Sequence, residues 1–331
     1  MTSGRDKELH EQAPARMPIT RPTTGPSIGL VLGGGGARGL AHILMLEVFD
    51  ELGIKPKIIA GTSIGAIFGA AYASGLSAAE IRAHTEEALT KRFELVRSLI
   101  ASRAQRRAGF WNLFTARTAL LKPGALLDVV LPATVARDFE ALDIPLRVVA
   151  SDYYGLEPVV FASGPLREAV AASMALPALF EPVNIGGRTL IDGGLTNPLP
   201  FDVIEGMADV IVAIDVSGVT VPSPKRTAPT AFEALFAASF LFERSIVREK
   251  LKLRQPDIYI DAGTGHYQAL EFLKVRDILA AAEPAKAMLR AKLERVLASE
   301  VLAEAAQEDA SQESAPLRRA RRGILKRLRK S

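Results

Sequence analysis

Short apolar runs alternate with longer segments of helical periodicity along most of the chain. The apolar runs predict strands over residues 27–32, 57–60, 146–150, 158–161, 188–191, 208–216 and 258–260. Helical spacing of apolar residues predicts helices over 38–52, 66–74, 77–90, 166–174, 231–253 and 280–306. The run 208–216 is almost continuously apolar, which is typical of a strand buried on both faces of a parallel sheet. The alternation predicts an α/β fold with three layers, α/β/α, around a largely parallel central sheet.

Changes in composition set the expected boundaries of the folded part. Residues 1–26 are polar and lack the apolar stretch of a Sec-type signal peptide, so they predict a disordered leader. We expect a folded domain over 27–306 and a flexible basic tail over 307–331. The segment 58–79 carries no charge and could span a bilayer by length. Its many Gly, Ala and Ser residues favour a buried strand followed by a closely packed helix, and we expect no transmembrane helix. The basic, aromatic segment 92–121 fits a lid or a packed satellite helix equally well.

The overall composition narrows the class of protein. The chain has 331 residues, 48% hydrophobic and 24% charged, as in ordinary globular proteins. It contains no cysteine, which excludes disulfides, thiol nucleophiles and cysteine metal sites and suits a reducing cytoplasm. The formal net charge of +4 is uneven, because residues 317–331 hold eight basic residues and no acidic one. The remainder of the chain is therefore mildly acidic.

The basic tail has an amphipathic pattern. Leu317, Ala320, Ile324 and Leu328 recur at helical spacing, although Gly323 interrupts the segment. Basic amphipathic helices lie in membrane interfaces, so we expect contact with an anionic membrane surface. A solvated, disordered tail is the alternative, and nucleic-acid binding is disfavoured because the tail has no aromatic residue to stack on bases. The expected location is the cytoplasm, with a peripheral contact to the inner face of the membrane.

Ser63 is the candidate nucleophile. It lies in the pentapeptide Gly61–Gly65, between the apolar run at 57–60 and the helical segment at 66–74. Strand, sharp turn and helix with a serine at the apex form the G-x-S-x-G nucleophile elbow. The glycines let strand and helix pass closely while the serine adopts a strained conformation. The hydroxyl then lies at a helix N-terminus, where N–H groups favour developing negative charge.

A serine nucleophile needs a base. Among the four histidines, His10 lies in the leader, His84 on a surface-type helix, and His42 where a packing role is expected. His266, in a Gly-rich loop, is a weak candidate. Asp192 is the stronger candidate, because it ends a strand and two glycines follow it. Asp-Gly-Gly is also an ordinary turn sequence, so this motif alone does not decide between base and turn.

The glycine-rich segment Gly34–Gly39 lies between a strand and a helix. Its backbone N–H groups can converge on an oxyanion. The same segment fits the dinucleotide pattern G-x-G-x-x-G at Gly34, Gly36 and Gly39. That pattern requires an acidic residue at the end of the second strand, and the serine turn occupies that place. The oxyanion interpretation is therefore favoured over the nucleotide one.

Four motifs together resemble the patatin-like phospholipase family, bacterial type. They are Gly33–His42 (GGGGARGLAH), Gly61–Gly65 (GTSIG), Ala172–Pro177 (ASMALP) and Asp192–Gly194 followed by Asn197 and Pro198. They occur in the family's order over about residues 27–205, and the resemblance is looser over the C-terminal extension 206–306. The resemblance implies a Ser-Asp dyad without histidine, in which Ser63 is the nucleophile and Asp192 the base.

The resemblance also assigns supporting residues. It implies that Gly34, Gly35 and Gly36 supply the oxyanion N–H groups, and that Arg38 stabilises the loop or binds a lipid phosphate. It implies no metal and no organic cofactor. The chain departs from the family's pattern at Leu44, where Gly is common, and at Ile64, where Ala is common. Both departures affect packing rather than chemistry.

The expected function is that of a lipid acyl hydrolase, of the phospholipase A, lysophospholipase or esterase type, which cleaves carboxylic esters through a Ser63 acyl-enzyme. The alternative is a membrane-binding or regulatory module that keeps the fold without turnover. An ordinary aspartate is a weak base for a serine hydroxyl. We therefore expect burial of Asp192 and strong stabilisation of the oxyanion.

Overall fold

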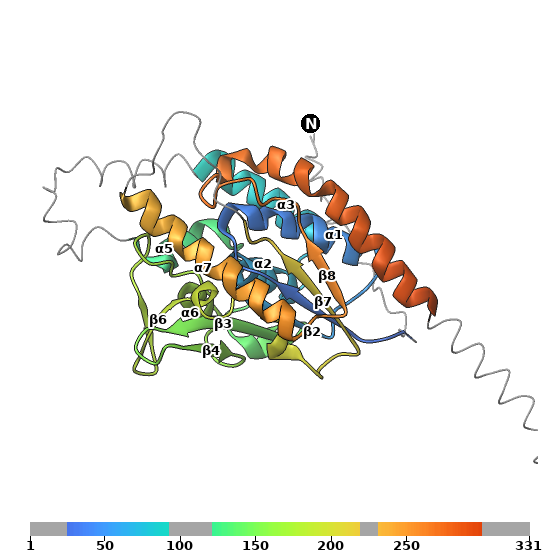
Figure 1. Ribbon diagram of the computed structural model, residues 1–331, viewed down its shortest axis with the longest axis horizontal. Coiled ribbons are helices and arrows are strands. Elements are labelled where there is room, and N and C mark those ends of the chain that lie inside the picture. Colours follow the sequence, from blue (N-terminus) through green and yellow to red (C-terminus); the bar gives the residue numbers. More distant parts are fainter. Residues whose placement is uncertain (1–24, 93–120, 219–230, 300–331) are drawn as a thin grey trace, which may run out of the picture.

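A mixed sheet of eight strands forms the centre of the computed structural model, which describes residues 25–92, 121–218 and 231–299 (Figure 1). The strands are β1 (Ile28–Leu32), β2 (Ile58–Thr62), β3 (Leu146–Asp152), β4 (Glu157–Phe161), β5 (Val183–Ile185), β6 (Arg188–Asp192), β7 (Val210–Asp215) and β8 (Ile258–Asp261). Their order is β5-β6-β3-β2-β1-β7-β8, and β4 pairs with β3 outside this path.

The sheet has a parallel centre and an antiparallel edge. All pairings among β3, β2, β1, β7 and β8 are parallel. β3 pairs antiparallel with β4 and with β6, and β5 pairs antiparallel with β6. Tight turns connect these edge strands, as at Gly186 and Gly187, which have φ of 58° and 79°. The largely parallel sheet expected from the sequence is therefore present at the centre. At the edge, the strands predicted over 146–150 and 158–161 pair antiparallel around the turn at Tyr154 and Gly155, and β5 and β6 add a second hairpin.

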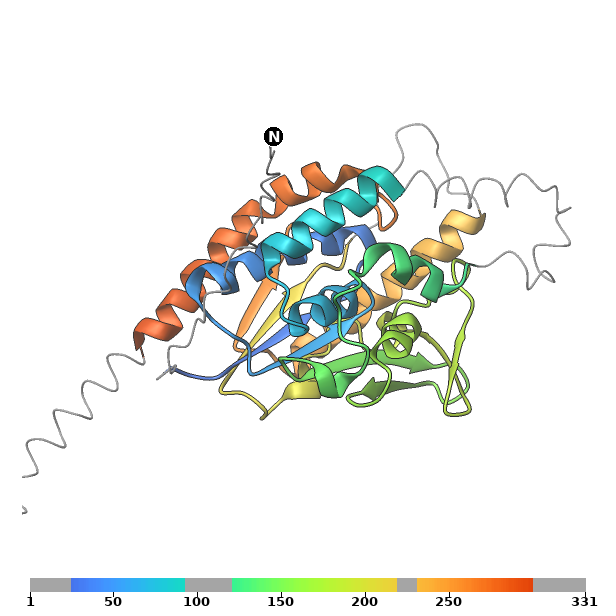
Figure 2. The same cartoon turned by 180° about the vertical axis from the view of Figure 1, so that it is seen from behind.

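Helices surround the sheet. The longer ones are α1 (His42–Leu52), α2 (Ile64–Ala73), α3 (Ala78–Glu87), α5 (Pro123–Val130), α6 (Leu166–Ser173), α7 (Ala231–Leu253) and a helix over 275–299. The short ones are η1 (Gly36–Ala41), η2 (Ala88–Arg92), η4 (Phe139–Ala141), η5 (Gly193–Leu195), η6 (Phe201–Ile204) and η7 (Phe272–Lys274). Helices α1, α3 and 275–299 lie side by side in both views (Figures 1 and 2). Ion pairs from Glu47 to Arg82 and Lys286 connect these three helices.

Alternate strand residues face two different hydrophobic cores. On one face, Leu30, Leu32 and Ile59 join the larger core with α1, α2 and helix 275–299. On the other face, Val31 and Ala60 pack in a smaller core that includes Val247 of α7. The sheet is thus covered on both faces, which confirms the three-layer arrangement predicted from the sequence.

The centre of the sheet also sets the place of the site. Leu32 of β1 is paired with Gly61 of β2 and with Ile214 of β7, so the three strands end at one level. In α/β sheets, ligands bind beyond the carboxyl ends of the parallel strands. The glycine-rich loop and Ser63 both follow at this end of the sheet.

The expected strands and helices are all present, with boundaries shifted by a few residues. The last helix begins at 275 rather than 280, and its expected end at 306 lies outside the described residues. The short elements α5 and β5 were not expected. The uncharged segment 58–79 is β2 followed by α2, as predicted, and no helix within the described ranges is both long and apolar enough to cross a membrane. The leader to residue 24, the segment 93–120 and the tail from residue 300 lie outside the described residues.

Candidate active site

Ser63 occupies a strained turn between β2 and α2. Its φ of 54° and ψ of −119° lie in a region that residues other than glycine rarely adopt. The flanking glycines make this turn possible. A Cβ at Gly65 would overlap the carbonyl oxygen of Leu32, and one at Gly61 would lie 2.6 Å from the carbonyl oxygen of Gly65. The elbow therefore requires glycine on both sides of the serine.

Ser63 and Asp192 form a hydrogen-bonded pair. The Ser63 hydroxyl donates to Asp192 Oδ2 at 2.7 Å, across 129 positions of sequence. Asp192 ends β6 and is 3% exposed. Its other oxygen, Oδ1, accepts the N–H of Gly194 at 2.8 Å. The structure thus brings together the two residues that the sequence suggested as nucleophile and base.

The environment of Asp192 makes it a stronger base than an ordinary aspartate. Burial raises the pKa of Asp192 to about 6, while hydrogen bonds from Gly194 and Ser63 act in the opposite direction. A base with a pKa near the working pH combines the ionised state with useful proton affinity. The desolvation that the Ser-Asp arrangement needs is therefore present.

Two serines that the sequence analysis did not single out support the pair. The hydroxyl of Ser173, at the end of α6, accepts the N–H of Ser63 at 2.8 Å and donates to Val149 O at 2.6 Å. The hydroxyl of Ser151, on β3, donates to the carbonyl oxygen of Asp192 at 2.8 Å. Ser173 lies in the motif Ala172–Pro177, so the sequence contained a signal that could have identified it. No sequence motif includes Ser151.

The glycine-rich loop approaches Ser63 from the end of β1. A Cβ at Gly34 would lie 3.6 Å from the Ser63 Cβ. The Gly34 N–H donates to Pro198 O at 2.9 Å, so in this structure it does not point at an oxyanion. Among the described residues, the N–H groups of Gly35 and Gly36 have no hydrogen-bond acceptor. Three glycines were expected to donate N–H groups to the oxyanion. The geometry favours Gly35 and Gly36 in this role over Gly34.

Residues 30–204 match the family described as patatin-like phospholipase. The chain belongs to this family. An uncharacterised NTE family protein of Mycobacterium tuberculosis is 33% identical over 245 residues, which cover 72% of this chain and 64% of that protein. Human patatin-like phospholipase domain-containing protein 6 is 33% identical over 219 residues, which cover 60% of this chain and 14% of that protein. The chain thus spans 64% of the mycobacterial relative's length.

The solved structure of VipD from Legionella pneumophila matches 78% of this chain and 67% of its own, with a TM-score of 0.38 and 16% identity.

Arg38 lies beneath α7. It is 2% exposed, its Nε donates to Gly35 O at 3.0 Å, and its guanidinium lies 4.8 Å from the ring centre of Phe240. Burial lowers the pKa of Arg38, while the charges of Glu243 and Asp215 act in the opposite direction. Of the two roles expected for Arg38, these contacts favour stabilisation of the loop over binding of a lipid phosphate.

Within the described ranges, none of His42, His84 and His266 is hydrogen-bonded to Ser63. His42 is fully buried, and its Nε2 lies 2.9 Å from Gly33 O. Burial lowers the pKa of His42 to about 4, so the ring is neutral near pH 7 and donates from Nε2 to the loop. His266 is exposed and its ring lies against Tyr267. His42 therefore supports the loop, in keeping with the packing role expected from the sequence.

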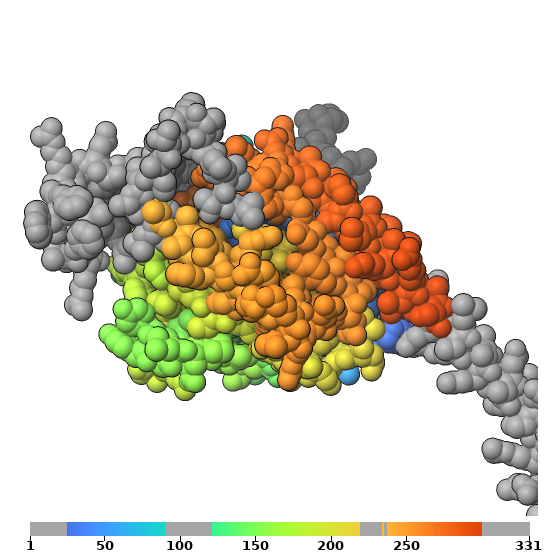
Figure 3. Space-filling model, in the orientation of Figure 1, coloured from blue at the N-terminus to red at the C-terminus, as the bar shows by residue number. Residues whose placement is uncertain are grey.

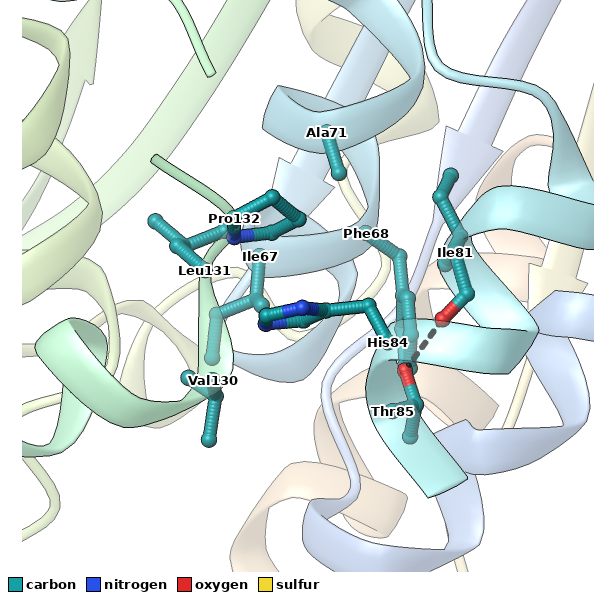
Figure 4. A pocket seen from close by; sticks show the side chains of 9 residues that line it. All are labelled: Ile67, Phe68, Ala71, Ile81, His84, Thr85, Val130, Leu131 and Pro132. Atoms are coloured by element: carbon teal, nitrogen blue, oxygen red, sulfur yellow. Dashed lines mark hydrogen bonds between the residues drawn. The ribbon is translucent and has the colours of Figure 1, made fainter. Parts of the chain in front are cut away.

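A small pocket lies between α2, α3 and the end of α5 (Figure 4). Its lining residues are Ile67, Phe68, Ala71, Ile81, His84, Thr85, Val130, Leu131 and Pro132. It has room for about one water molecule, which is too little for an acyl chain. His84 is half-buried rather than solvated, and its Nε2 has no hydrogen-bond partner among the described residues. Over the same residues, no cluster of three His, Asp or Glu side chains could hold a metal ion.

Proposed function

We propose that this chain hydrolyses carboxylic ester bonds of lipids through a Ser63 acyl-enzyme, with phospholipids or lysophospholipids as the substrate class. The observation that carries the proposal is the 2.7 Å hydrogen bond from the Ser63 hydroxyl to Asp192 Oδ2, made from a strained elbow. Membership of the patatin-like phospholipase family supports lipid hydrolysis in general.

The first half of the reaction acylates Ser63. Its oxygen attacks the ester carbonyl carbon while its proton passes to Asp192 Oδ2. The N–H groups of Gly35 and Gly36 stabilise the resulting oxyanion, and such a donor is worth about 3 kcal/mol in other hydrolases. The intermediate collapses as Asp192 returns the proton to the departing alcohol oxygen. An acyl-enzyme on Ser63 and a free alcohol result.

The second half removes the acyl group. Asp192 takes a proton from a water molecule, and the hydroxide attacks the acyl carbon above the same N–H groups. The proton then returns to the Ser63 oxygen as the fatty acid leaves. Atoms and charges balance without any group other than water.

A covalent serine probe tests this proposal on the full chain. We expect a fluorophosphonate to label the wild-type protein and to leave Ser63→Ala unlabelled, with parallel loss of nitrophenyl ester and phospholipid turnover. Ser299→Ala, at the exposed end of helix 275–299, is the matched control and should label normally. The silent regulatory module predicts vesicle binding without labelling, and that result in a folded wild-type protein would overturn the proposal.

We also propose that the basic segment 317–331 holds the enzyme at an anionic membrane surface on the cytoplasmic side. Its eight basic residues support this, since each contributes about 1 kcal/mol near an anionic surface before screening by salt. Co-sedimentation of the full chain and a 1–315 truncation with anionic and neutral vesicles tests it. We expect truncation and added salt each to reduce binding to anionic vesicles, with soluble ester turnover unchanged. Equal sedimentation of both proteins would refute the tail's role.

A further inference from the structure

Helix α7 crosses the site although it lies outside the family match over residues 30–204. Its middle and end are attached to the domain: Val247 is buried in the smaller core, and Lys250 Nζ donates to Asn197 Oδ1 at 2.7 Å and to Leu199 O at 2.9 Å. Orange atoms, which include α7, cover the middle of the face shown in Figure 3. The helix therefore presents its inward side chains to the dyad from a fixed position.

Glu243 is the inward side chain that reaches the dyad. It is 3% exposed, although carboxylates are seldom buried so completely. A Cβ at Gly194 would lie 2.8 Å from Glu243 Oε1 and 3.1 Å from Asp192 Oδ1. The two carboxyl groups therefore face each other across the width of one missing methyl group. Gly194 lies between them, and its N–H donates the hydrogen bond that Asp192 Oδ1 accepts.

The surroundings of Glu243 favour its neutral form. Burial raises the pKa of Glu243 well above its usual range, the charges of Asp192 and Asp215 raise it further, and only Arg38 opposes them. Arg244, also on α7, carries a positive charge that lowers the pKa of Arg38. Burial and the neighbouring carboxylates therefore favour a neutral carboxyl group beside Asp192.

We propose that Glu243 is a positioning residue of the dyad: its carboxyl group closes the site over Gly194 and Asp192 and keeps water from the Asp192 carboxylate. The inference rests on the proposed function of Ser63 and Asp192. Its physical basis is that a carboxylate shielded from water is a stronger base than a hydrated one. Glu243 acts through Asp192 and does not touch the reacting ester.

The pH profile of ester hydrolysis tests this role on the full chain. Glu243→Ala opens space for water beside Asp192, so we expect the acidic limb of kcat/KM to move down by about one pH unit or more. The plateau kcat should fall, with KM for a short soluble ester little changed. Glu243→Gln keeps the size and neutrality of the protonated side chain, and its acidic limb should coincide with that of the wild type. Glu249→Ala, on the exposed side of the same helix, is the matched control and should leave the profile unchanged.

The outcomes distinguish failure of the positioning role of Glu243 from failure of the proposed Ser-Asp mechanism. An unchanged acidic limb in a folded Glu243→Ala protein would overturn the positioning role and leave the Ser-Asp mechanism standing. A Gln variant that behaves like the Ala variant would also overturn it, because a neutral side chain of equal size should suffice. Absence of both labelling and turnover in the wild-type protein would refute the proposed function itself. Circular dichroism and thermal unfolding of each variant exclude misfolding as the cause of a shifted limb.

Discussion

The proposed role of Asp192 as base gives a direct prediction for the pH dependence of ester hydrolysis and for Asp192→Asn. Only the ionised carboxylate of Asp192 can accept the Ser63 proton. Burial raises the pKa of Asp192 to about 6. The active form is therefore present above pH 6 and is lost as the pH falls through that value. Asparagine preserves the size of the side chain and the acceptor for Gly194 N–H, but it cannot take a proton.

The expected fall in kcat/KM follows from the fraction of Asp192 that is ionised at each pH. With a pKa of about 6, about 90% of Asp192 is ionised at pH 7 and about 10% at pH 5, so kcat/KM should fall about tenfold between them. An aspartate with an ordinary pKa near 3.9 would lose less than about 10% of its activity over the same interval. The Asn variant should lose about 10²–10⁴-fold in turnover at pH 7 and show no acidic limb over this range.

The same shift has a consequence for stability. A carboxyl group whose pKa is raised in the folded state lowers the free energy of unfolding wherever it is ionised. For Asp192, this loss of stability is absent below the pKa of the unfolded chain and complete above pH 6. At 1.36 kcal/mol per pKa unit, it amounts to about 3 kcal/mol at pH 7. We therefore expect Asp192→Asn to be at least as stable as the wild type at pH 7.

The assay measures short-chain nitrophenyl ester hydrolysis from pH 4.5 to 8 together with urea unfolding. Asp128→Asn, on the exposed side of α5, is the matched control and should behave as the wild type. A wild-type acidic limb centred near 4, or near-normal turnover of a folded Asp192→Asn protein, would refute the reasoning.

Two further predictions concern the contacts that support Ser63, and a third concerns the identity of the base. Ser173→Ala removes the acceptor of the Ser63 N–H, so we expect about 2 kcal/mol less stability in urea unfolding and a lower kcat; an unchanged kcat would contradict a supporting role. Gly65→Ala places a Cβ in the backbone of β1 and should lower stability by about 3 kcal/mol, whereas Gly124→Ala, with open space around it, should be neutral in the same measurement. His266→Gln should keep turnover within about tenfold, and a loss of 10² or more would instead identify a histidine base.

Local chemistry explains why the sequence predicted so much of this fold. Strands such as Ile28–Leu32 and helices such as α1 follow from the spacing of their own apolar residues. The antiparallel pairing of β6 with β3 was not predicted, because the direction of β6 relative to β3 depends on pairing between distant segments. Short elements such as β5, with three residues, carry too few positions to show a period.

The sequence by itself determined the elbow, because glycines at 61 and 65 are required by contacts within one turn, and it suggested Asp192 as the base. Only the tertiary structure decided how these parts work together. It set the 2.7 Å contact between Ser63 and Asp192, directed the Gly34 N–H to Pro198 O, and placed Glu243 near Asp192 across Gly194. Burial and hydrogen bonding of this kind arise from segments far apart in the chain, and the pKa of a carboxyl group depends on what surrounds it in space rather than on its neighbours in sequence.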